Sequence, residues 1–197
     1  PKVHITHLPA THDFIKGEFS IPGGVFIAKN HTWFSINQEG IAKIGIDDFA
    51  KKLIGKIDSI EFPNLGMNVK AGQPLFTVKQ GNRSVTFNST ITGKISQVNT
   101  LLKDNLVALE MTPYERNWIC ALDTDKIDDE IKGMSIGKSA VALFQDDIEK
   151  CKILMKDLLK SEKRESEYIG EVQIYIGQLE ELSDVNWQKV VAEFFRR

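Results

Sequence analysis

One short segment of this sequence could present reactive side chains at an exposed turn. Gly81 and Asn82 are residues that favour tight turns, and Lys79 and Arg83 flank them. Short apolar stretches on both sides indicate two strands, so the segment is predicted to be the tip of a β-hairpin. Lys79 supplies the only primary amine near this tip, and the pattern places it in the rising strand rather than in the turn.

The histidines are the next candidates, because imidazole can bind metals or transfer protons. His4, His7 and His12 gather near the start of the chain, yet their spacing matches no helical i, i+4 pair and no cysteine accompanies them. We therefore predict no metal site there. His31 precedes a predicted strand, where its ring is expected to satisfy a hydrogen bond.

Motifs for nucleotide binding and nucleophilic catalysis are incomplete. Three residues separate Gly133 from Gly137-Lys138-Ser139, whereas a phosphate-binding loop needs four, so a serine-capped helix start is the better interpretation. Neither a GxSxG motif nor a cysteine–histidine signature surrounds Cys120 or Cys151. No catalytic residue is predicted, and the protein is not expected to be an enzyme.

Three pairs of aspartates could supply carboxylates: Asp47-Asp48, Asp128-Asp129 and Asp146-Asp147. Adjacent residues do not share one face of a helix, so neither member of a pair reinforces the other at a site. Such pairs are typical of helix starts and solvated surfaces, and we expect them there.

Composition limits the partners. With 197 residues, 42% of them hydrophobic, the chain can form one or two soluble domains. A net charge of −2 shows no basic footprint for nucleic acid or an anionic membrane, and no apolar run is long enough to span a bilayer. The two cysteines lack a CxxC spacing and no signal peptide is visible, which favours a reduced, cytoplasmic location.

The sequence divides into three parts: an N-terminal segment (1–21), a strand-rich part (22–122) and a helical part (123–197). Short apolar stretches bounded by Gly, Pro and Asn predict strands in the middle part, with one short helix over 47–53. The predicted strands cover 24–28, 32–36, 41–46, 57–62, 74–78, 85–87, 93–98, 106–109 and 118–122. This pattern is typical of a sandwich or barrel.

The helical part has few Gly and Pro residues. Apolar residues at spacings of three and four predict one amphipathic helix from Ala140 to about Lys163. Tyr168 to Leu182 is interpreted as helix, although alternating Val172, Ile174 and Ile176 would also suit a strand, and a last helix should begin at Ser183, a good N-cap. The apolar stripes could fold back on the sheets, pair with each other or bind a second protein.

A series of short matches in the middle part resembles one family. They are His31-Thr-Trp33, Ile44 to Ala50, Leu53 to Gly55, Pro63 to Gly66, Val69 to Gly72, Thr92-Gly93 with Val98-Asn99, and Pro113-Tyr114 with Trp118. In this order they resemble the H protein of the glycine cleavage system over residues 22–122. The resemblance implies a lipoyl-like β-sandwich, a barrel-sandwich hybrid. The predicted C-terminal helical extension is longer than the tail expected of that family, and together they give an α+β fold class.

In that family a lysine at a hairpin tip carries lipoic acid and so transports an aminomethyl group between enzymes. Counting back from Thr92-Gly93 places the lysine position at Asn82, with Lys79 where an acidic residue is usual and Arg83 where alanine is usual. We therefore expect no cofactor, and a hairpin tip of Gly81, Asn82 and Arg83 in place of the lipoyl-lysine site.

The sequence thus predicts a non-catalytic, H-protein-like module that binds a protein partner of unknown identity. Two alternatives stay open. The first is a working lipoyl carrier with lipoate on Lys79, which would require a shifted hairpin register. The second is a small-molecule-binding protein whose pocket lies between the sandwich and the helices.

Overall fold

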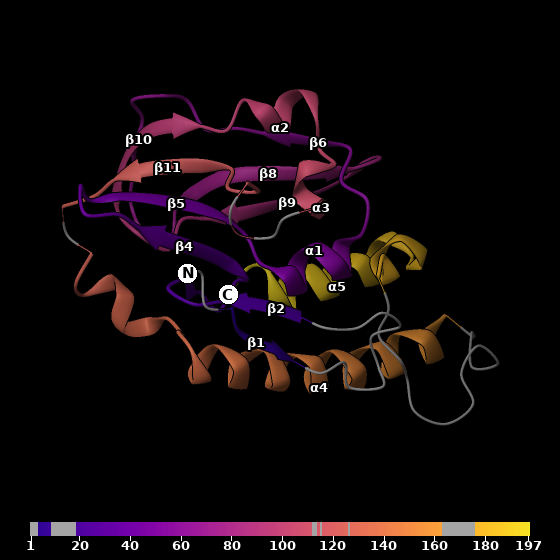
Figure 1. The fold of residues 1–197 in the computed structure, drawn as a ribbon. Helices are drawn as coiled ribbons and strands as arrows, with labels where there is room; N and C mark the ends of the chain where they lie inside the picture. Colours follow the sequence, from indigo (N-terminus) through magenta and orange to yellow (C-terminus); the bar gives the residue numbers. More distant parts are fainter. Residues whose placement is uncertain (1–3, 9–18, 112–113, 115, 126, 163–175) are drawn as a thin grey trace.

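Two antiparallel β-sheets form the first half of the protein (Figure 1). The computed structural model describes residues 4–8, 19–111, 114, 116–125, 127–162 and 176–197. A six-stranded sheet has the order β3-β4-β5-β11-β10-β7, a three-stranded sheet has the order β6-β8-β9, and β1 pairs with β2 in a separate ribbon. The strands are β1 His4–Leu8, β2 Phe19–Pro22, β3 Phe26–Ile27, β4 Thr32–Ile36, β5 Ile41–Ile46, β6 Ser59–Glu61, β7 Asn68–Val69, β8 Pro74–Gln80, β9 Arg83–Asn88, β10 Gly93–Val98 and β11 Cys120–Asp123.

One face of each hairpin strand packs on the core, and burial therefore alternates along the strand. In β9, Val85 and Phe87 are buried and their neighbours are less so, as expected when successive side chains point to opposite faces. Phe87 stacks on Phe76 of β8 with ring centroids 5.4 Å apart. Residues from both sheets belong to one hydrophobic cluster, which confirms the predicted sandwich.

The helices follow local signals. Asp47 caps α1, since its Oδ1 accepts from the Ala50 N–H at 2.9 Å, and Gly55 with φ = +83° ends that helix. Ser183 likewise caps α5 by accepting from the Asn186 N–H. The helices are α1 Asp48–Ile54, α2 Leu101–Asp104, α3 Ala108–Met111, α4 Lys138–Ser161 and α5 Asp184–Phe194, with the 3-10 helices η1 Glu130–Gly133 and η3 Gln178–Glu181.

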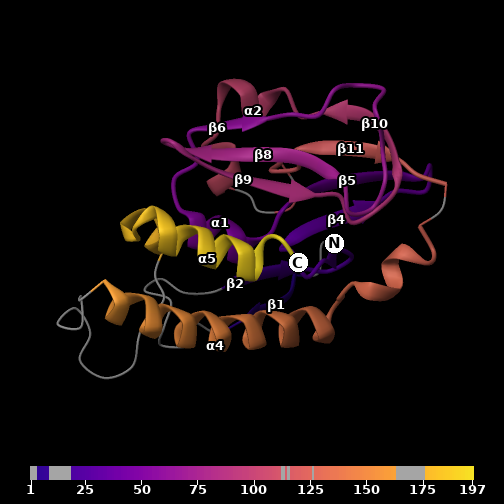
Figure 2. The ribbon, with the colours of Figure 1, turned by 180° about the vertical axis from the view of Figure 1, so that it is seen from behind.

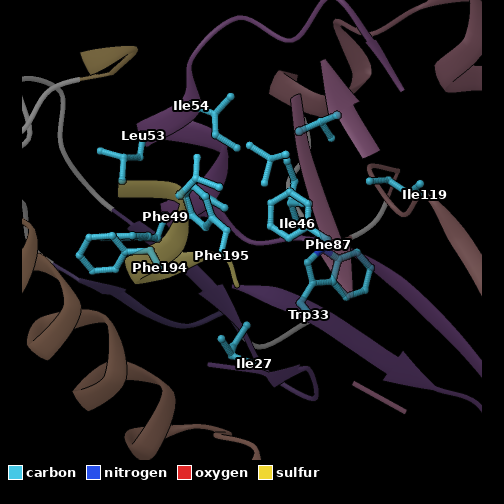
Figure 3. Packing of buried hydrophobic residues seen from close by; sticks show 14 of the residues in the cluster. Ile27, Trp33, Ile46, Phe49, Leu53, Ile54, Phe87, Ile119, Phe194 and Phe195 are labelled. Carbon is cyan, nitrogen blue, oxygen red and sulfur yellow. The ribbon is translucent and has the colours of Figure 1, made fainter. Parts of the chain in front are cut away.

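The C-terminal helices fold back on the sandwich. Both ribbon views show α4 along one side of the molecule, with α5 and the β1–β2 ribbon between it and the sheets (Figures 1 and 2). Phe194, Phe195 and Phe49 of α1 lie together in the core (Figure 3), and the rings of Phe49 and Phe194 are 5.5 Å apart between centroids. Phe195 also contacts Phe87 of β9, with centroids 5.6 Å apart. The apolar stripes of the helices are therefore buried inside this chain.

Residues from all three predicted segments meet in one cluster. Phe19, from the N-terminal segment, lies 5.9 Å from Phe49 and 5.5 Å from Phe144 of α4, measured between ring centroids. The linker before α4 is also attached, because Ile27 and Ser135 exchange two backbone hydrogen bonds of 2.8 Å. The division of the chain into three domains at residues 22 and 123 therefore stays a prediction from sequence composition.

Two predicted elements differ from the structure. The strand predicted over 106–109 is a turn that leads into α3, because Asn105 accepts locally from the Val107 N–H and Val107 stays 53% exposed. Of the helix predicted from Tyr168 to Leu182, residues 168–175 lie outside the described part. Its end is the short 3-10 helix η3, which follows Gly177 in the left-handed region.

Two expectations about polar residues in the helical part were wrong. The N-cap of α4 is Gly137 instead of a serine, and the Ser139 hydroxyl bonds to Ile136 from inside the first turn. Asp147 was expected at the surface, yet it is fully buried on the same face of α4 as Phe144 and Cys151. The predicted amphipathic helix itself is confirmed.

Candidate functional site

The predicted hairpin tip is the candidate site. Only Gly81 and Asn82 connect β8 to β9, and Gln80 and Arg83 are the last paired residues. Gly81 has φ = +56°, which other residues rarely adopt, and its N–H donates to Asp58 Oδ2 at 2.7 Å. Both turn residues are exposed. The turn is therefore the one predicted, fixed at its first residue by a carboxylate from outside the hairpin.

Lys79 lies in β8, two residues before the turn. It pairs with Ser84 of β9 on one side and with Ser59 of β6 on the other. Its amine forms an ion pair with Glu61 of β6, and its side chain is 41% exposed. The amine thus lies along the face of the three-stranded sheet and not at the tip of the hairpin.

Arg83 is held by the C-terminal part of the chain. Its Nε donates to Asp184 Oδ1 at 2.8 Å, its Nη1 to the Leu179 carbonyl at 3.0 Å and its Nη2 to the Leu182 carbonyl at 2.6 Å. The guanidinium carbon lies 5.9 Å from the centre of the Trp187 ring. The planar donor set of arginine suits such a group of acceptors, whereas a lysine could not match it. The residue beside the turn therefore anchors α5 and η3.

The last residue before the turn is tied to the end of α1. Gln80 Nε2 donates to the carbonyls of Ile54 at 2.6 Å and Lys56 at 3.0 Å. The Lys56 N–H in turn donates to Glu180 Oε1 at 2.8 Å. Around these contacts lies a hollow of about 300 Å³, lined by Gln80, Gly81, Asn82, Arg83, Glu180 and Asp184. The hairpin tip and the C-terminal segment thus form one continuous surface.

A second cavity, of about 240 Å³, lies beyond the end of α1. Its lining includes apolar side chains of Ile57, Leu106 and Leu109 and the ammonium-bearing side chains of Lys51 and Lys56. It lies between α1 and the segment leading into α3, and not between the sandwich and the C-terminal helices. This is the place where the described residues could accept a small molecule.

The other residues considered from the sequence are placed as follows. His31 is buried between Asp47 and Asp147, a grouping that the sequence did not reveal. His4 and His7 lie in β1, and His12 lies outside the described residues. Cys120 and Cys151 are free and buried, and burial raises the pKa of the Cys120 thiol to about 12. Within the described ranges no group of three or more potential metal ligands occurs.

Among the helices of the described residues, none combines the length and the apolar character that crossing a bilayer requires.

Sequence comparison relates the chain to one family. A family model described as "Glycine cleavage H-protein" matches residues 25–147. The probable glycine cleavage system H protein of Thermococcus gammatolerans is 30% identical over 116 residues, which cover 59% of this chain and 86% of that protein. The glycine cleavage system H protein of Xylella fastidiosa is 32% identical over 103 residues, covering 52% and 79% respectively.

Structural comparison agrees. The crystal structure of a glycine cleavage system H protein from Mycobacterium marinum matches with a TM-score of 0.51 and 23% identity, covering 57% of this chain and 97% of that one. This likeness concerns the fold. The matched family range ends inside α4, so all groups that hold the Arg83 guanidinium lie beyond it.

Proposed function

The chain belongs to the glycine cleavage H-protein family, and from that premise we propose that it is a member without a lipoyl group, which acts by binding another protein. The chain would then have the fold of the family without its carrier chemistry, since a fold does not by itself fix a function. We place this function in the cytoplasm, in keeping with two cysteines that are both free and buried.

The observation that carries the proposal is the composition of the hairpin tip. A lipoyl group is attached through an amide to a primary amine, and it must extend from the protein to reach other active sites. Gly81 and Asn82 make up the whole turn, and neither has an amine. The next side chain, Arg83, is a guanidinium bound to Asp184 and two carbonyls.

The same geometry supports a role in protein binding. The turn is exposed, and the hollow beside it is lined by hairpin residues and by Glu180 and Asp184. Hydrogen bonds from Arg83 hold the hairpin against the C-terminal segment, and those from Gln80 hold it against the end of α1, so this surface is preorganised. A preorganised surface loses less conformational entropy when a partner binds.

Lipoylation of Lys79 is the alternative carrier function. Its amine would have to leave Glu61, and the strand would have to expose it beyond the turn. A small-molecule function is the other alternative, supported by the cavity of about 240 Å³ near Lys51 and Leu106. A ligand that copurifies from the native host and is lost on substitution of Leu106 would support that second alternative.

Lipoylation can be tested directly by intact mass. The full chain is produced with a lipoate ligase and lipoate, with a family member that has a tip lysine as the positive control for the ligase. We expect no lipoyl adduct on the wild-type chain and a single adduct on Asn82→Lys, because that substitution puts an amine into an exposed turn. An adduct on the wild type that disappears in Lys79→Ala would establish the carrier alternative and contradict the proposal.

Partner binding can be tested by site-specific crosslinking in the native host. Both native cysteines are buried, so Asn82→Cys adds an exposed thiol at the tip for a photoreactive label. Lys138→Cys, at the exposed start of α4, is the matched control. We expect one protein to crosslink to position 82 but not to position 138, with competition by unlabelled wild-type protein. Equal, non-competed labelling from both positions would count against binding at the tip.

A further inference from the structure

A group of charged residues lies in the core, at the opposite end of α5 from the contact between Asp184 and Arg83. The side chains of His31, Asp47 and Asp147 are completely buried, and that of Arg197 is 20% exposed. His31 Nδ1 lies 2.8 Å from Asp47 Oδ2, and His31 Nε2 lies 3.2 Å from Asp147 Oδ2. Arg197 Nη1 donates to Asp147 Oδ1 at 2.7 Å. We call these four residues the buried charge cluster.

The cluster joins the sandwich to both C-terminal helices. His31 precedes β4, Asp47 caps α1, Asp147 lies within α4 and Arg197 follows α5. The imidazole stacks on Phe49 with centroids 4.2 Å apart. Aromatic rings surround it further out, those of Phe144, Phe194 and Phe195, at 5.8, 6.4 and 6.1 Å. The ring is therefore the polar centre of an otherwise apolar contact.

The charge count favours a proton in the His31–Asp47 pair, and the pKa values of both partners are raised, that of Asp47 by burial. Two buried carboxylates face the imidazole, one at each ring nitrogen, and Arg197 supplies a single positive charge. A neutral imidazole has one N–H and would direct a lone pair at one of the carboxylates. Burial alone would lower the pKa of His31, but the charge of Asp47 and the contacts with both aspartates raise it above 6.5.

Other charged groups face the cluster from the same elements. On α1, Asp48 lies beside Asp47 and pairs with Lys51 and Lys52. On α4, Lys150 Nζ lies 3.5 Å from Asp147 Oδ1, and burial raises the pKa of the Cys151 thiol. On α5, Glu193 Oε1 lies 3.3 Å from Arg197 Nη2. Among these neighbours, Lys150 is the lysine that directly faces an aspartate of the cluster, so Lys150→Gln is its control.

We propose that the buried charge cluster is a proton-dependent contact that controls how often α4 and α5 detach from the sandwich. While His31 is protonated the helices stay docked, and loss of that proton makes their opening more frequent. Opening would expose the apolar face that includes Phe49 and Phe87, which the helices otherwise cover. This inference is independent of whether the hairpin tip binds a partner.

The direction of the pH effect follows from proton linkage. A folded-state pKa above the unfolded value stabilises the docked state fully below pH 6.5. That stabilisation is lost as the pH rises through the folded-state pKa. Between these two pKa values, opening releases one proton, so each pH unit changes the opening equilibrium by about tenfold.

The experiment is hydrogen exchange of the full chain between pH 6 and pH 10, corrected for the intrinsic exchange rate. We expect the opening of peptides from α5 to rise by about tenfold per pH unit over the window in which His31 titrates. Peptides from β5 and β11 serve as the internal control. His31→Asn is the matched variant, since asparagine tolerates the positive φ of +60° at this position but does not titrate.

Titration of the wild-type imidazole by NMR gives a second measurement, and the resonance is assigned by its absence from His31→Asn. A pKa above 6.5 together with pH-dependent opening in wild type and Lys150→Gln supports the proposal. A His31 that is neutral at pH 7 overturns it. Equal pH dependence of α5 and β11, or loss of the effect in Lys150→Gln, overturns it as well.

Discussion

Arg83 Nε donates to Asp184 Oδ1 at 2.8 Å, although the two residues are 101 positions apart in the sequence. The contact joins the first residue after the hairpin turn to the first residue of α5. The remaining guanidinium nitrogens bind the carbonyls of Leu179 and Leu182, at the end of η3. Carbonyls at the end of a helix favour a cation, so one side chain binds both the end of η3 and the first residue of α5.

Replacing this arginine should weaken the attachment of the C-terminal segment. Arg83→Lys keeps the charge but loses the planar donor set, and we expect the free energy of unfolding to fall by about 1–3 kcal/mol. Urea unfolding followed by tryptophan fluorescence measures it, since Trp187 is buried close to Arg83. Lys79→Gln breaks only an exposed ion pair and should change stability by less than about 0.5 kcal/mol. Equal, small effects from both variants would contradict this account of Arg83.

Gly55, at the end of α1, lies close to Gly177, at the start of η3. Substitution of Gly55, with Gly72 as the control position, tests how tight this approach is. Gly55 and Gly72 have nearly the same φ, +83° and +87°. A Cβ at Gly55 would lie 2.5 Å from Gly177 Cα, whereas nothing lies within 4 Å of one at Gly72. Gly72→Ala should cost about 1 kcal/mol for the backbone alone, and Gly55→Ala about 1–3 kcal/mol more for the clash. Thermal unfolding of both variants checks the difference, and equal losses would show that the approach is not tight.

Local sequence signals predicted the elements, but not the contacts between distant ones. Gly81-Asn82 specified the hairpin turn, and Asp47 and Ser183 specified two helix starts, because each signal acts within a few residues. The partners of Arg83 could not be found this way, since no local pattern connects a β-turn to a helix a hundred residues later. A signal for Asp147 did exist: it lies three residues after Phe144 on the apolar stripe of α4, where an unpaired charge is unfavourable.

Removal of the helical part should expose the core of the sandwich. A chain that ends at Asp125 retains β11 but loses α4 and α5, which cover Phe19, Phe49 and Phe87. We expect this fragment to aggregate or to bind a hydrophobic dye, without a cooperative thermal transition. A soluble fragment with a sharp transition would instead make the extension an independent unit. Calorimetry of the fragment and of the full chain distinguishes the two results.

The stability of the protein at acidic pH should depend on the charge of Asp147. Burial would raise its pKa, but the contact with His31 and the hydrogen bond from Arg197 outweigh burial and hold the pKa below 3.8. A lowered folded-state pKa stabilises the protein above pH 3.8, and that stabilisation is lost as the pH falls through the folded value. Asp147→Asn removes a buried carboxylate from beside His31 and Arg197, so at pH 7 it should cost about 3–5 kcal/mol. Urea unfolding at pH 7, 5 and 3.5 measures the difference in the free energy of unfolding between wild type and Asp147→Asn. This difference should become smaller only at pH 3.5. A difference that stays constant would mean that the charge of the Asp147 carboxylate does not contribute to stability.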